Sequence, residues 1–181
     1  MSAAVLSPTP TPTPTPTPAQ AAAPSLSPAA REAIADLLER YGHALDDDRV
    51  EEWSGFFEPD GVYQVTTREN LRAGRPIGIV LCEGRGMLDD RVKALRIANI
   101  FESHTHRHVM GRPLIEPRAD GCCEARTSFV IYRTMYTGET EVFATGRYDD
   151  VLKPGPQGWR IAQRRVVLDS RMVDTLMVYP L

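Results

Sequence analysis

The sequence is poor in cysteine, nearly balanced in charge and free of long apolar runs. Its 181 residues include three cysteines, at positions 82, 122 and 123, and this odd number favours reduced, buried thiols over a set of disulfides. The net charge of −3 supplies no large positive field for nucleic acid or an anionic membrane. No apolar run approaches the roughly 20 residues of a membrane helix, and the first residues lack the pattern of a secretion signal. We therefore expect a cytoplasmic protein without nucleic-acid or membrane partners.

The first residues consist largely of alternating proline and threonine. Proline at every second position removes amide donors and fixes φ, so neither a helix nor a central strand is expected there. We interpret residues 1–28 as an extended, solvated tail and residues 29–181 as one domain, whose length and hydrophobic content suit a single core. The tail is either a tether or the result of a start codon assigned too far upstream, and the sequence is compatible with both.

The beginning of the domain has the spacing of helices. Ser27 and Pro28 are typical of an N-cap and a first helical position, and the apolar stripe that follows predicts a helix to about Leu45. Asp48 and Glu51 have the spacing of a capping box, which predicts a short second helix with its aromatic residues facing the core.

The rest of the domain reads as one more helix and a series of strands. Residues 58–61 predict a turn, residues 62–67 a first strand and residues 86–98 a third helix. From residue 105 onward, long strands alternate with turn signals. Helices followed by a strand meander indicate an α+β fold, with the helices on one face of a curved antiparallel sheet.

Three segments of the sequence resemble a known family. They are YGHALDDDRVEEWSGFF, MLDDRVKALRIANIFESHTHRHVMG and the ending DSRMVDTLMVYPL. In the second, a basic amphipathic helix runs directly into a strand with alternate histidines. Together they resemble the small (β) subunits of aromatic-ring-hydroxylating dioxygenases, of the terephthalate, anthranilate or salicylate type, over about residues 29–181. The resemblance implies the cone-shaped fold of the NTF2-like (cystatin-like) superfamily.

The resemblance also implies a function and partners. Such a chain is a non-catalytic, structural subunit of the terminal oxygenase component, and it assembles with a large (α) subunit into an α3β3 hexamer whose β chains form a trimeric base. The α subunit carries a Rieske [2Fe–2S] cluster and a mononuclear Fe(II), and electrons from NAD(P)H reach it through a reductase or ferredoxin. The complex inserts both atoms of O2 into an aromatic ring, while the β chain gives little information on which aromatic acid is the substrate.

The cysteines do not have the spacing of a Rieske cluster. Such a cluster is bound through Cys-x-His and Cys-x-x-His pairs, whereas no histidine follows Cys82, Cys122 or Cys123 at either spacing. We therefore expect no metal and no cofactor in this chain. If the chain belongs to a dioxygenase, another subunit must supply both metal centres.

Three histidines raise the possibility of a different metal site. His104, His106 and His108 would share one face of a strand, and three imidazoles suit zinc, copper or non-haem iron. The glutamate that follows the His-x-His pair of cupins is missing here. Hydrogen bonding within the sheet or at a subunit contact is the simpler interpretation.

The aspartates after the first helix suggest an enzymatic alternative. Stand-alone members of the same superfamily set a carboxylate against a histidine inside the cone for proton transfer. Asp46 or Asp47 with His106 or His108 would be the catalytic pair of such a lyase or isomerase. A third alternative is a small-molecule binding module without chemistry. The simpler interpretation assigns no catalytic residue and leaves the aspartates solvated or capping a helix.

A basic cluster lies on and before the third helix. It consists of Arg85, Arg91, Lys93 and Arg96. Such a run is usually a solvated face paired with acidic neighbours, and its functional alternative is docking to an acidic surface of a larger partner.

Overall fold

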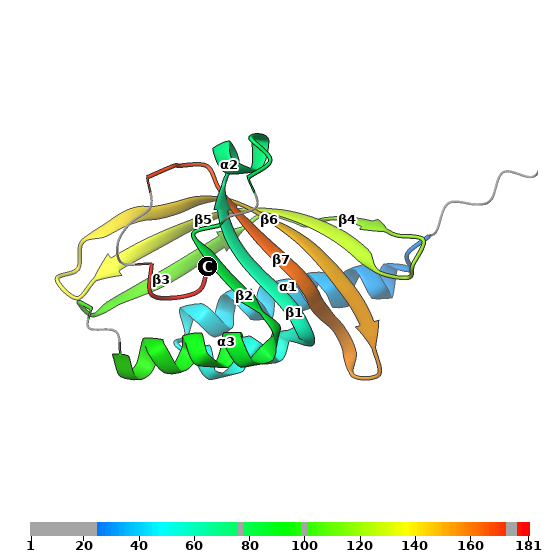
Figure 1. The fold of residues 1–181 in the computed structure, drawn as a ribbon, viewed down its shortest axis with the longest axis horizontal. Coiled ribbons are helices and arrows are strands. Elements are labelled where there is room, and N and C mark those ends of the chain that lie inside the picture. The colour runs from blue at the N-terminus through cyan, green and yellow to red at the C-terminus, as the bar shows by residue number, and fades with distance from the viewer. Residues whose placement is uncertain (1–24, 76–77, 99–100, 173–176) are drawn as a thin grey trace, which may run out of the picture.

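The computed structural model describes residues 25–75, 78–98, 101–172 and 177–181, in which one curved sheet packs over several helices (Figure 1). The strands are β1 (Phe57–Thr67), β2 (Val80–Glu83), β3 (His104–Met110), β4 (Leu114–Pro117), β5 (Cys123–Met135), β6 (Thr140–Gly155) and β7 (Gly158–Leu168). The order across the sheet is β2-β1-β7-β6-β5-β3, and β4 also pairs with β5. Most of the expected tail, residues 1–24, lies outside the described residues, so the division at residue 28 stays a prediction.

Neighbouring strands run antiparallel in every described pair except β1 and β7, which are parallel. The predicted α+β class, with helices packed on a curved sheet, is confirmed; the sheet is mixed rather than antiparallel throughout, because β1 and β7 run parallel. The remaining strands lie between β1 and β7 in the sequence, so no tight hairpin forces these two strands to run in opposite directions. The sheet is strongly curved and open, which agrees with the cone that the resemblance implies (Figure 1).

Most of the helices lie against the concave face of the sheet. The helical elements of the described chain are α1 (Pro28–Asp46), α2 (Arg68–Arg72), α3 (Gly84–Lys93), the 3₁₀ helix η1 (Val50–Phe56) and the π-helical turn η2 (Ala94–Ala98). α1 and α3 both lie below the concave face, whereas α2 projects beyond the end of β1 (Figure 1). Within the described residues, no helix is both long and apolar enough to cross a membrane.

α1 begins and packs as its sequence predicts. Ser27 Oγ accepts a hydrogen bond from the backbone N–H of Ala30 at 3.2 Å, and Pro28 occupies the first turn. The apolar stripe that faces the sheet consists of the buried residues Ile34, Leu37, Leu38, Tyr41 and Leu45. Their spacing of three and four positions places them on one side of the helix. The helix ends at Asp46, next to the predicted end.

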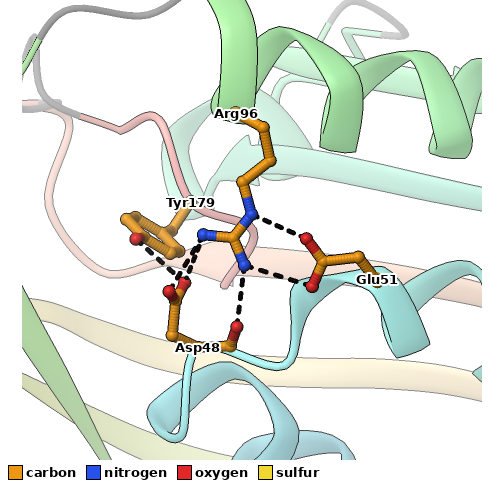
Figure 2. A network of polar contacts seen from close by, with 4 residues as sticks. All are labelled: Asp48, Glu51, Arg96 and Tyr179. Carbon is orange, nitrogen blue, oxygen red and sulfur yellow. Dashed lines mark hydrogen bonds and ion pairs between the residues drawn. The ribbon is translucent and has the colours of Figure 1, made fainter.

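The predicted capping box of Asp48 and Glu51 is wrong. Asp48 has a left-handed backbone with a φ of 58°, whereas a capping residue has an extended backbone, and η1 has no side-chain cap. Both carboxylates instead accept hydrogen bonds from Arg96 in η2 (Figure 2). A short second helix forms nevertheless, with Val50 and Trp53 fully buried on its inner side.

Two other predicted boundaries are shifted. Residues 58–61, expected as a turn, belong to β1, whose pairing with β7 changes register between Phe57 and Val62. An irregularity of this kind accommodates a polar, proline-containing segment within a strand. The third helix starts at Gly84 rather than residue 86 and widens into a π-helical turn from Ala94.

Candidate functional site

The interior of the cone is partly filled by the segment 177–181. Leu181 is only 1% exposed; its carbonyl oxygen accepts a hydrogen bond from the Tyr41 hydroxyl at 2.8 Å. Its backbone N–H donates to the Tyr63 hydroxyl at 2.9 Å. The Tyr41 hydroxyl also accepts from Nε1 of Trp53 at 2.9 Å. These contacts connect the segment to α1, η1 and β1, so residues of the chain itself occupy this part of the interior.

A buried ion pair occupies the inner face of the sheet. Arg164 on β7 donates to both carboxylate oxygens of Asp150 on β6, each at 2.8 Å, and both side chains are completely buried. The guanidinium carbon lies 3.9 Å from the ring centroid of Tyr41 and 4.3 Å from that of Tyr148. Sequence reasoning missed both charges. The available signal was their position in strands whose alternate residues face the core.

The tyrosines of this region are held in the neutral form. Burial raises the pKa of Tyr41, Tyr63 and Tyr148 above the usual tyrosine value. A neutral tyrosine donates and accepts hydrogen bonds but is a poor proton acceptor. In the filled part of the interior, Tyr41, Tyr63 and Tyr148 are therefore neutral side chains that form structural contacts, and none of the three is a phenolate base.

His104, His106 and His108 share the inner face of β3, as the alternation of strand side chains predicts. The His106 ring lies 4.9 Å from the Phe143 ring and 5.5 Å from the Tyr179 ring, between centroids. Burial, together with the neighbouring His104 and His108, lowers the pKa of His106 to about 3. His106 is therefore a neutral ring within an aromatic cluster.

The histidine face does not form a metal-binding group. Across the described ranges, no three His, Cys, Asp or Glu side chains are grouped so that they could hold a metal ion. The three cysteines are free thiols; Cys82 and Cys123 are buried, whereas Cys122 is half-buried. The geometry gives no support to the metal-site interpretation of the three histidines.

One of the predicted carboxylate–histidine pairs does form. Asp46, the last residue of α1, lies 2.6 Å from Nδ1 of His108, and both side chains are only 2% exposed. The same carboxylate accepts from the backbone N–H of His108, with both of its oxygens at 3.0 Å. Burial alone would raise the pKa of Asp46, but the hydrogen bonds from His108 outweigh it and lower that pKa. Because an ionised carboxylate only accepts, the His108 ring must donate from Nδ1.

The other members of the predicted pair lie apart. Asp47 is exposed and pairs with Arg49 at 3.5 Å, on the outside of the turn. The His106 ring packs against the rings of His104, Phe143 and Tyr179. The structure thus joins Asp46 with His108 and does not join Asp47 with either histidine. Helix termination explains the difference, because Asp46 still lies on the inward stripe of α1 and Asp47 does not.

The basic cluster is bound within the chain. Arg96 donates to Glu51 at 2.7 Å and to Asp48 at 2.9 Å, and the Tyr179 hydroxyl donates to Asp48 at 3.1 Å (Figure 2). The other three members contact the carbonyl oxygens of Phe57 and Met177 or the side chain of Asp90. These contacts connect η2, the turn after α1 and the segment 177–181. Docking to an acidic partner stays a prediction that this arrangement does not favour.

Comparison with known proteins shows similarity over most of the domain. Residues 27–165 match the family model of the SnoaL-like domain. The chain is 42% identical over 148 residues to the terephthalate 1,2-dioxygenase, terminal oxygenase component subunit beta 1, of Comamonas sp. The aligned region covers 82% of this chain and 96% of the relative. It is 39% identical to the anthranilate 1,2-dioxygenase small subunit of Burkholderia cepacia, over 80% of this chain and 90% of the relative.

A solved structure shares both the sequence and the fold. The crystal structure of a β subunit assigned to an aromatic-ring-hydroxylating dioxygenase of Novosphingobium aromaticivorans is 37% identical, with a TM-score of 0.77, and the match covers 84% of this chain and 97% of that one. These identities extend over nearly the full length of the relatives. The chain therefore carries a SnoaL-like domain and belongs to the small (β) subunits of aromatic-ring-hydroxylating dioxygenases.

Proposed function

We propose that this chain is a structural, non-catalytic β subunit in the terminal oxygenase of an aromatic-acid dioxygenase. The observation that carries the non-catalytic role is that residues of the chain itself fill the part of the cone around Tyr41 and Tyr63. A substrate pocket needs an open cavity with convergent polar groups. Here Leu181 and the Arg164–Asp150 pair occupy space inside the cone and are bonded to residues of the same chain.

The redox centres would belong to a large (α) subunit. The cysteine and histidine spacing of this chain does not suit a Rieske cluster. We infer that the α subunit carries the [2Fe–2S] cluster and the mononuclear Fe(II), with electrons supplied from NAD(P)H through a reductase or ferredoxin. The substrate class, an aromatic acid, is inferred from the terephthalate and anthranilate enzymes of the relatives. We place the complex in the cytoplasm, where NAD(P)H is available.

The outer face of the sheet supports assembly into a larger complex. Val109 on β3, Tyr132 on β5 and Val142 on β6 are exposed apolar residues. Ile131 faces the core, so the next residue on β5, Tyr132, points to the opposite, convex side of the sheet. Val142 on β6 is the strand partner of Tyr132 and lies on the same side. Exposed apolar groups on adjacent strands suit burial against another chain. We propose that a second copy covers them, within the β trimer of an α3β3 hexamer.

The Asp46–His108 hydrogen bond favours a second candidate function, a proton-transfer lyase or isomerase. A carboxylate on Nδ1 fixes the tautomer of a histidine and leaves Nε2 to act as a base. The same carboxylate also binds the backbone N–H of His108, on an edge strand that α1 covers. We propose that the pair fastens α1 to β3 and has no catalytic role.

Co-expression with a candidate large subunit tests this proposal. Asp46→Asn removes the negative charge from the Asp46–His108 pair, which would be the acid–base pair of a lyase or isomerase. Asp47→Asn makes the same change at the next residue, which is exposed, and is the matched control. Turnover is normalised to the co-purified large subunit, with circular dichroism and light scattering as checks on fold and mass. For a structural subunit, both variants should stay within a few-fold of the parent per assembled complex.

The two candidate functions predict different results. Loss of a general base typically lowers the rate by about 10²–10⁴-fold with the fold intact. Such a loss in assembled Asp46→Asn, with Asp47→Asn unaffected, would overturn the structural role. A chain that remains monomeric and also fails to co-purify with the large subunit would contradict the proposed assembly.

A further inference from the structure

We propose that a groove between α2 and the outer face of β1 and β7 binds an oxyanion, which is the carboxylate or phosphate group of a small molecule. The groove has a volume of about 350 Å³, which is within the range of small-molecule sites. Its charged residues are Arg75, which follows α2, and Arg165 of β7. Among the described residues, its lining contains no carboxylate. The groove lies outside the cone and adds a ligand site to the structural role proposed above.

The sheet places Arg165 on the outer side of the molecule. Arg164 points into the core, so the next residue on β7 points to the opposite, convex face. Gln64 on β1 is the strand partner of Arg165, and its Oε1 accepts a hydrogen bond from Nε of Arg165 at 3.1 Å. Neither NH₂ group of Arg165 is bonded within the described chain, and neither is buried. The guanidinium is therefore held at Nε and keeps both NH₂ groups available to a ligand.

Arg75 supplies a second guanidinium from the turn after α2. Its side chain is exposed, and Nη1 donates to Oδ1 of Asn70 at 3.4 Å. Its backbone N–H also donates to the carbonyl oxygen of Asn70, at 3.0 Å, which fastens the turn to α2. The side-chain partners of Arg75 and Arg165 in the described chain are thus neutral amide oxygens rather than carboxylates.

The acidic strand partner of Arg165 is Asp149 on β6. The Asp149 carboxylate accepts from Nε of Arg126 and from Nε of Arg147, both at 3.0 Å. Within the described ranges, no hydrogen bond or ion pair joins Asp149 to Arg165. A carboxylate that two other guanidinium groups share neutralises little of the charge on Arg165.

The wider surface around α2 is also basic. Asp169 binds Arg68, and Glu69 lies 3.8 Å from Arg171, so the acids near the helix are already paired. This groove and a second one beside α2 are lined by two acids, Glu69 and Asp169, and five arginines, Arg68, Arg72, Arg75, Arg165 and Arg171. The surface thus has an excess of positive charge in a chain whose net charge is −3. Such a local field favours the approach of an anion.

The chemistry of the groove selects negative charge. A guanidinium binds carboxylate and phosphate oxygens through charge-assisted hydrogen bonds, and its planar NH₂ groups suit two oxygens at once. A neutral ligand lacks this attraction, and a cation is repelled by both arginines. Leu71 of α2 provides an apolar contact for the rest of the ligand.

Titration of the purified full chain with benzoate, inorganic phosphate and benzamide tests the proposal. Benzamide has nearly the shape of benzoate without its charge. Calorimetry should show saturable binding of benzoate or phosphate, and the tighter of the two identifies the preferred group. Benzamide should bind roughly tenfold or more weakly than this anion, because it lacks the charge-assisted hydrogen bonds. Added sodium chloride should weaken the binding of the anion, since the arginines are accessible to solvent.

A matched pair of variants on β7 tests the location. Arg165→Gln removes a guanidinium of the groove, whereas Arg160→Gln makes the same change on the same strand, at a residue outside the groove. Anion binding should weaken roughly tenfold in Arg165→Gln and in Arg75→Gln and stay near the parent value in Arg160→Gln. Circular dichroism and thermal unfolding check that each variant is folded.

Three outcomes would each overturn the proposal. They are the absence of saturable binding of both anions at millimolar concentration, binding of benzamide as tight as that of the preferred anion, and equal loss of binding in Arg160→Gln and Arg165→Gln.

Discussion

Arg164 on β7 and Asp150 on β6 form a bidentate ion pair that is closed to solvent, with the guanidinium between the rings of Tyr41 and Tyr148. Burial opposes the charge on the guanidinium, but the Asp150 carboxylate outweighs burial and raises the pKa of Arg164 above its usual value. A buried charge that loses its partner is strongly destabilising, whereas loss of both charges together is often tolerated. The pair is therefore a sensitive point of the core.

Single and double replacement of this pair should differ in stability. Asp150→Leu should lower the free energy of unfolding by about 3–5 kcal/mol, because Arg164 keeps a buried and uncompensated charge. The double variant with Arg164→Met should recover a large part of that loss. Denaturant unfolding of the parent, both single variants and the double variant measures the coupling. A double variant as unstable as the sum of the two single changes would contradict the prediction.

Stability should fall at acid pH because of His106. Its pKa is about 3 in the folded chain, below its ordinary value of 6.5, since burial disfavours the charged ring. Between these values the unfolded chain binds a proton that the folded chain rejects. The free energy of unfolding therefore decreases as pH falls through this window, by up to about 1.4 kcal/mol per pH unit.

Replacement of His106 tests this pH dependence. His106→Phe retains an aromatic ring beside Phe143 and cannot titrate, so the curve of stability against pH should be flatter than that of the parent. His43→Gln is the control, because His43 lies on the exposed side of α1. An unchanged slope in His106→Phe would show that other groups dominate acid unfolding.

Arg96 should hold the segment 177–181 in place. Arg96 binds the Asp48 carboxylate, and that carboxylate also accepts a hydrogen bond from the Tyr179 hydroxyl (Figure 2). Loss of Arg96 therefore releases the carboxylate that positions Tyr179. Individual exposed ion pairs are worth about 0–1 kcal/mol, so Arg96→Ala should lower the free energy of unfolding by roughly 1 kcal/mol. Hydrogen exchange at the Leu181 amide should become faster. Lys93→Ala is the control, because it removes an exposed ion pair with Asp90. It should change the free energy of unfolding and the exchange rate of the Leu181 amide less than Arg96→Ala does.

The chain purified alone should be colourless and should contain no stoichiometric iron. The required cysteine–histidine pairs for a Rieske cluster are missing from the sequence. Visible absorption and elemental analysis measure both properties. Iron bound reproducibly at one per chain and lost in His106→Ala would refute this prediction.

Deletion of residues 1–24 should leave the melting temperature and assembly nearly unchanged. A tail of alternating proline and threonine has few groups that can bury apolar surface. Thermal unfolding and light scattering of the truncated and full chains provide the comparison. A decrease of the melting temperature by several degrees would show that the tail docks on the domain.

Local patterns in the sequence determined the elements and the family. The N-cap at Ser27, the apolar stripe of α1 and the alternation of His104, His106 and His108 follow from spacing along one helix or one strand. The absence of Rieske-type pairs was also evident from spacing alone. Such features survive folding because each depends on residues that are close together in the chain.

Tertiary structure decided which of these residues meet. Asp46 rather than Asp47 reaches His108, 62 positions away, because of where α1 ends against the edge strand. Asp48 and Glu51, spaced for a cap, bind Arg96 instead, because a left-handed residue redirects the turn and η2 brings a cation to it. The Tyr41–Leu181 contact spans 140 positions and depends on the curvature of the sheet. Pairings of this kind depend on strand register and packing, for which the sequence has no local signal.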